Sequence, residues 1–116
     1  MNQPLLPPSL REQLVANGRR SLRGEDLDPP PVVKLFTPDG AATWLLTEID
    51  PAAPTRAFGL CDLGLGAPEL GYVDLSELAA VRGRLGLPVE RDVHFHGDRP
   101  LSTYAAEAQA AGKITA

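Results

Sequence analysis

The sequence predicts an α+β fold, in which a four- or five-stranded, mainly antiparallel sheet has helices packed on it. Short stretches between residues 32 and 74 are rich in β-favouring side chains and are separated by turns, which is typical of an antiparallel meander. A helical pattern follows over 74–85 and gives the main helix expected to cover the sheet. Short helices are expected near the two ends of the chain.

The N-terminal part begins with an irregular stretch, residues 1–8, which holds three prolines. Ser9 is a suitable cap for a helix over 10–17, and Gly18 fits the position just after it. Residues 24–31 are acidic and end in three prolines, so they can be neither helix nor central strand. We expect this segment to be a stiff connection inside one domain that spans the whole chain.

Four strands are expected before the main helix, at 32–37, 42–50, 57–63 and 70–74. The turn between the first two contains Pro38, Asp39 and Gly40. Strict alternation along the second strand predicts Leu45 and Ile49 on one face, and Trp44 and Leu46 on the other.

The main helix has a clear start and end. Asp74 lies three residues before Glu77, the spacing of a capping box at the first turn. An apolar stripe at helical spacing follows, formed by Leu75, Leu78, Val81 and Leu85. Gly83 or Gly86 can end the helix, and Pro88 prevents its continuation. At the C-terminal end, a last helix is expected over roughly 103–111, with Gly112 after it.

A fifth strand is expected over 91–95, and its polar face is the best metal candidate in the chain. Alternation would place Asp92, His94 and His96 on one side, and imidazole and carboxylate groups are good ligands for zinc or iron. The competing interpretation is an edge strand that shows polar residues to water. Because the chain holds only two histidines, we favour no metal and no other cofactor.

Several stretches together resemble one bacterial family. They are ELGYVDLSELAAVRGRLGLPVERDVHF at 69–95, KLFTPDGAATWLLTE and FGLCDLG before it, and PLSTYAAEAQAAGKI after it. This sequence resembles the domain of unknown function numbered 2958. The resemblance implies a compact domain carried on plasmids, integrative elements or phages, and it brings no agreed catalytic residues.

Composition limits the function further. Hydrophobic residues make up 43% of the chain, enough for a packed core, and the net charge of −4 argues against strong binding to nucleic acid. The single Cys61 excludes an internal disulfide, and we expect it to be a small buried residue and no nucleophile. With no signal-peptide pattern and no apolar run of about 20 residues, we expect a cytoplasmic protein that does not bind membranes.

Three groups of residues are candidates for binding. The first is the polar set beside the last strand, which forms either structural ion pairs between helix and sheet or a contact surface: Arg82, Glu90, Arg91, Asp92 and His94. Trp44 with Tyr72 is a second, aromatic candidate, with burial of the tryptophan as the alternative. The third is the cluster Arg19, Arg20 and Arg23, which either stays solvated at a helix end or meets an anionic partner.

These observations favour a small non-enzymatic accessory protein that binds another protein. In the mobile-element setting that the resemblance implies, we expect it to interfere with a host defence system. Two alternatives remain open: a metal-binding module or metal-dependent enzyme that uses Asp92, His94 and His96, and a nucleic-acid-binding accessory protein that uses the arginine cluster.

Overall fold

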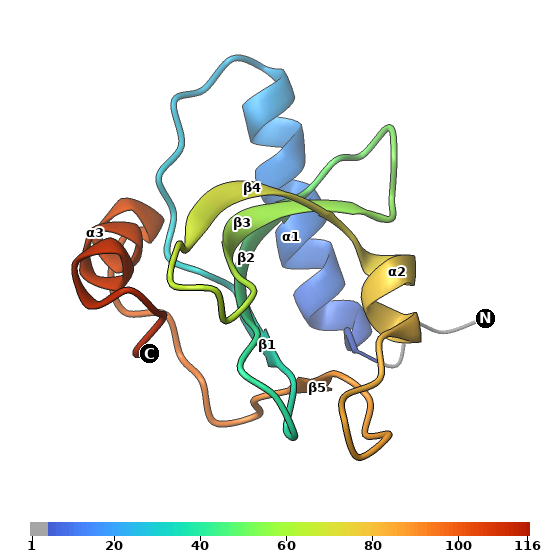
Figure 1. The fold of residues 1–116 in the computed structure, drawn as a ribbon. Helices are drawn as coiled ribbons and strands as arrows, with labels where there is room; N and C mark the ends of the chain where they lie inside the picture. The colour runs from blue at the N-terminus through green and yellow to red at the C-terminus, as the bar shows by residue number, and fades with distance from the viewer. Residues whose placement is uncertain (1–4) are drawn as a thin grey trace.

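A computed structural model describes residues 5–116 and confirms the α+β fold (Figure 1). One antiparallel sheet has the strand order β4-β3-β2-β1-β5. The strands are β1 (Val33–Phe36), β2 (Thr43–Ile49), β3 (Arg56–Asp62), β4 (Glu69–Asp74) and β5 (Glu90–Arg91). The helices are α1 (Pro8–Leu22), α2 (Leu75–Ala80) and α3 (Leu101–Ala111). Of the predicted irregular lead-in over 1–8, residues 1–4 lie outside the described part of the chain.

Helix α1 covers one face of the sheet and is longer than predicted. Leu14 is fully buried in a core that includes Leu35 and Leu46. The helix starts directly after Pro7 with no side-chain cap, so Ser9 is not the cap; Pro8 needs no amide partner in the first turn. It also continues past Gly18, because that glycine is a contact point with the sheet and not the helix end.

The contact at Gly18 is made with β2. A Cβ atom at this position would overlap the carbonyl oxygen of Ile49. Glycine therefore lets α1 lie directly against the backbone of the strand. Nearby, the Asn17 side-chain amide donates to the carbonyl of Thr47 at 2.9 Å, which fixes the helix along the same strand.

Helix α3 covers the opposite face of the sheet, on the left in Figure 1. Its buried side, which includes Tyr104 and Ala108, packs against Leu45 and Leu60. Gly112 follows in the left-handed conformation (φ 77°), and this confirms the predicted end of the helix.

Strand β2 contains an irregularity that alternation alone did not predict. The pairing with β3 shifts register between Leu46 and Glu48, which indicates a β-bulge. The shift moves Ile49 to the α1 face, in the same buried cluster as Trp44 and Leu46. The expectation that Ile49 shares a face with Leu45 is therefore wrong.

Helix α2 is shorter than the predicted helix over 74–85. Asp74 caps it as expected, since its carboxylate accepts from the amides of Ser76 and Glu77. The hydrogen bond from the Ser76 hydroxyl, followed by the bonds from the two amides, lowers the pKa of Asp74. The helix ends at Ala80, because Val81 is extended and Arg82 forms a β-bridge with Pro88. Leu75 and Leu78 are buried, whereas the side chain of Leu85 is 80% exposed. The main covering helices are α1 and α3.

The connection between α1 and β1 is fastened to the start of α3. Residues 25–31 form no helix or strand, as predicted. The amide of Leu101 donates to the carbonyl of Pro29 at 3.1 Å, and the amide of Ser102 donates to the Asp28 carboxylate at 2.9 Å. Asp28 thus caps α3 from a distant part of the chain.

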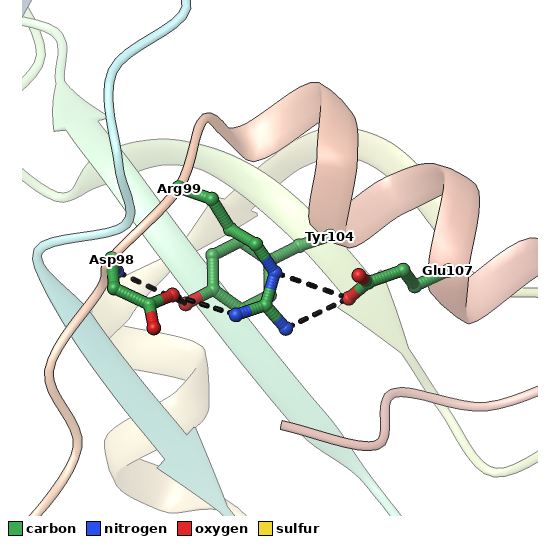
Figure 2. A network of polar contacts seen from close by, with 4 residues as sticks. All are labelled: Asp98, Arg99, Tyr104 and Glu107. Atoms are coloured by element: carbon green, nitrogen blue, oxygen red, sulfur yellow. Dashed lines mark hydrogen bonds and ion pairs between the residues drawn. The ribbon is translucent and has the colours of Figure 1, made fainter.

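A polar network fixes the chain just before α3 (Figure 2). The Tyr104 hydroxyl donates to the Asp98 carboxylate at 2.9 Å, and this bond, followed by the neighbouring Arg99, lowers the pKa of Asp98. Arg99 also pairs with Glu107 at 2.8 Å and lies over the Tyr104 ring at 4.2 Å. The segment between β5 and α3 is thereby held at the end that leads into α3.

Candidate functional site

Strand β5 lies at one edge of the sheet and is only two residues long. Glu90 and Arg91 pair with Phe36 and Leu35 of β1, which confirms that the last strand joins the sheet. The predicted continuation to Phe95 is wrong.

Beyond Arg91 the chain turns away from the sheet. The amide of Phe95 donates to the carbonyl of Asp92 at 3.2 Å, and the amide of His94 donates to the Asp92 carboxylate at 2.9 Å. A short polar side chain that binds its own following backbone favours a turn over a strand. The same carboxylate pairs with Lys34 at 3.5 Å.

This turn removes the geometry on which the metal hypothesis rested. Asp92, His94 and His96 do not alternate along a strand, so no common strand face aligns them. The amide of His94, followed by the charge of Lys34, lowers the pKa of Asp92. Over residues 5–116, no three His, Cys, Asp or Glu side chains are grouped in a way that could hold a metal ion.

Two hollows flank β5, and both are lined by Arg91 and Val93. One, of about 470 Å³, lies between β5, the end of α2 and the chain around Arg82 and Pro88. The other, of about 510 Å³, lies between α1, the proline segment and residues 91–97. The side chain of Val93 is 64% exposed between them. We call Arg82, Glu90, Arg91 and Val93 the β5 surface.

The polar side chains of the β5 surface are not tied to one another. On the ion-pair interpretation Arg82 would pair with Glu90 or Asp92, but its Nη1 donates to the carbonyls of Ala79 and Val81 at 3.0 and 2.8 Å. In the described part of the chain, the side chains of Glu90 and Arg91 make no hydrogen bond or ion pair. The interpretation of this set as ion pairs that fasten helix to sheet therefore fails.

A loop beside this surface was missed at the level of sequence. The Asp39 carboxylate, from the turn between β1 and β2, accepts from the amides of Leu85 and Leu87 at 2.7 and 3.4 Å. A Cβ atom at Gly83 would overlap this carboxylate, and Gly86 has a φ of 79°. We call residues 82–88 the pinned loop. The two glycines opposite a Pro-Asp-Gly turn were the only sequence signal for it.

The pinned loop presents apolar and basic side chains to solvent. Leu85 and Leu87 are exposed, the latter by 42%, and Arg84 is exposed between Arg82 and Leu85. Pro88, which closes the loop, also lines the smaller of the two hollows. The loop and the β5 surface are therefore continuous.

The aromatic candidates are not brought together. Trp44 is only 4% exposed and belongs to the core on the α1 face. Tyr72 is 59% exposed on β4, where its ring contacts Phe58 at a centroid distance of 5.1 Å. The Arg56 guanidinium lies 4.0 Å from the Tyr72 ring centre. Tyr72 thus remains a surface residue without Trp44.

The arginine cluster lies at the end of α1 and is partly neutralised. Arg20 and Arg23 both pair with Glu25 at 3.0 Å, and these hydrogen bonds lower the pKa of the Glu25 carboxyl. Arg19 is exposed in the last turn of the helix. Glu25, from the acidic segment over 24–31, therefore offsets one of the three positive charges of the cluster.

Cys61 lies half-buried in β3. Burial raises the pKa of its thiol to about 11, so the thiolate that a nucleophile needs is scarce near neutral pH.

Comparison with known proteins gives one match. The family model described as protein of unknown function (DUF2958) matches residues 5–115. No curated protein and no solved structure matches the chain. Within residues 5–116, none of the helices has the length and apolar character needed to cross a membrane.

Proposed function

This chain belongs to the DUF2958 family, and from that premise we propose that it is a small non-enzymatic accessory protein that binds a protein partner through the β5 surface. On this proposal it works in the cytoplasm, is carried by a plasmid, integrative element or phage, and modulates a host defence system.

One observation carries the proposal: Arg91 and Val93 stand between two hollows, and Arg91 has no partner of its own among the described residues. Arginine beside a pocket is a frequent anchor of protein interfaces, because its planar group makes several hydrogen bonds once it is desolvated. An exposed valine next to it adds apolar area. The short β5 strand is held by the regular strand β1, so the anchor has a rigid support.

The proposal is tested by capture of partners from the native host with the tagged protein and its Arg91→Ala variant. We expect capture by the variant to fall about tenfold, which corresponds to a loss of about 1.4 kcal/mol in binding free energy. The melting temperature should stay unchanged, as is usual for a surface substitution.

The matched control is Arg19→Ala, an exposed arginine on α1 outside the β5 surface, which should leave capture unchanged. The proposal is wrong if Arg91→Ala captures the same partners as the unchanged protein. It is equally wrong if both arginine variants lose capture to the same extent.

A further inference from the structure

We infer that the pinned loop and the β5 surface together bind an acidic protein segment that carries apolar side chains. The inference rests on the proposed function and names the chemistry of the partner. Neither the loop nor this class of partner follows from the family match.

The end of the molecule that holds the pinned loop and the β5 surface carries more basic than acidic side chains. Three arginines, Arg82, Arg84 and Arg91, lie here, although the whole chain has a net charge of −4. They outnumber the two acids beside them, Glu90 and the Asp39 carboxylate that accepts from backbone amides of the loop. The surface is thus locally basic in an acidic protein, and charge complementarity selects an acidic partner.

The same surface also exposes apolar side chains. Leu85, Leu87 and Val93 are all substantially exposed; the two leucines lie in the loop, and Val93 lines the hollow that Pro88 also lines. Apolar side chains that gather in one exposed patch mark an interaction site, whereas single exposed ones do not. A hollow of about 470 Å³ has room for apolar side chains of a partner.

The pinned loop is held in one conformation by contacts within the protein. Asp39 holds two amides of the loop, Gly83 leaves room for that carboxylate, and the bridge between Arg82 and Pro88 closes the base. A loop that already has its bound shape loses little conformational entropy on binding. The exposed leucines are therefore held in place before any partner arrives.

Protein fits this surface better than nucleic acid or lipid. The surface offers three aliphatic side chains and no aromatic ring on which a base could stack. Glu90 lies among the arginines, and the net charge of −4 repels polyanions such as DNA or an anionic membrane. A mixed acidic and apolar peptide satisfies both the arginines and the leucines.

The test uses the full chain and three short fluorescent peptides of equal length: glutamate with leucine, glutamate with serine, and lysine with leucine. Binding is followed by fluorescence anisotropy at low and moderate salt. We expect the glutamate–leucine peptide to bind at least about tenfold more tightly than either of the others, with affinity falling as salt rises.

Variants then locate the contact. Arg84→Ala and Leu85→Ser should each weaken the glutamate–leucine peptide several-fold, while Leu22→Ser, an exposed leucine at the end of α1, should not. Asp39→Ala leaves every proposed contact residue in place but releases the loop, and it should also weaken binding. Amide NMR spectra check that each variant keeps its fold.

Single-stranded DNA and vesicles with anionic lipid are tested alongside. Tighter binding of either one than of the glutamate–leucine peptide overturns the inference, as does equal binding of all three peptides or no binding at all. If the peptides fail while Arg91→Ala still lowers capture of host partners, the proposed function stands and only the acidic, apolar character of the partner is wrong. If Arg91→Ala leaves capture unchanged, the proposed function fails first.

Discussion

Gly18 and Gly83 each allow a close contact that a side chain would prevent, but they lie in two different parts of the molecule. At both, the missing Cβ makes room for a group that a side chain would overlap. At Gly18 the group is a backbone carbonyl of β2, deep between α1 and the sheet. At Gly83 it is the carboxylate of Asp39, at the edge of the molecule.

The difference lies in what can move. The Ile49 carbonyl belongs to the backbone of a strand that is paired with β3, so an added methyl group at Gly18 must push the whole helix away. A carboxylate at the end of a side chain can rotate, so an added methyl group at Gly83 costs local hydrogen bonds only. The contact of Gly18 with the backbone of β2 therefore supports the fold, whereas the contact of Gly83 with the Asp39 side chain shapes a surface loop.

The largest effect is expected where α1 fills the core. Leu14→Ala should lower the free energy of unfolding by about 2–5 kcal/mol, because Leu14 is fully buried and leaves a cavity. Denaturant unfolding with an unchanged slope measures this loss. A change below about 0.5 kcal/mol would show that α1 does not carry the stability that the comparison assigns to it.

Gly18→Ala is the sharper test, since alanine favours helix over glycine by about 1 kcal/mol. We nevertheless expect a net loss of roughly 1–3 kcal/mol, because overpacking against the Ile49 carbonyl outweighs that gain. Thermal or denaturant unfolding gives the value. Higher stability in this variant would show that α1 can accommodate a side chain against the strand.

Gly83→Ala should have a smaller effect, about 0.5–1.5 kcal/mol, because the two hydrogen bonds at risk are exposed and water can replace the lost carboxylate. The change should be local: the amides of Leu85 and Leu87 lose the Asp39 carboxylate and exchange faster with solvent. Hydrogen exchange measured amide by amide checks this. Faster exchange throughout β1 and β2 would mean that the loop supports the whole fold.

The smallest effects are expected in the β5 surface itself. Arg82→Ala removes two hydrogen bonds to exposed carbonyls at the end of α2 and should cost below about 1 kcal/mol. Arg91→Ala should stay within about 0.5 kcal/mol of the unchanged protein. Denaturant unfolding of the two variants under the same conditions shows which one loses more stability. A larger loss for Arg91 would identify it as a structural residue.

Local patterns predicted much of this fold. The cap at Asp74 depends on neighbours two and three residues away, and the left-handed Gly112 ends the helix directly before it. The turn at Pro38–Gly40 likewise joins adjacent strands. Each of these features depends on a few consecutive residues, and the structure confirms them.

The features that were missed depend on residues far apart in the chain. Gly18 reads as a helix end until Ile49 is placed beside it, and the helix pattern up to Leu85 is broken by Asp39, which lies 46 residues earlier. The candidate site shows the same division. Arg82, Glu90 and Arg91 were named from the sequence, but Val93 was not. The exposure of Leu85 depends on how the loop closes against Asp39.

The bonds between Asp28 and Ser102 have a consequence for synthesis of the chain. These residues are 74 positions apart, and ribosomes add about 5–20 residues per second, so Asp28 is synthesised about 4–15 s before its partner at the start of α3. During that interval Leu45 and Leu60 have no helix to cover them. The nascent chain therefore exposes an apolar sheet face until its last helix emerges, and this is the period in which we expect it to be most prone to aggregation.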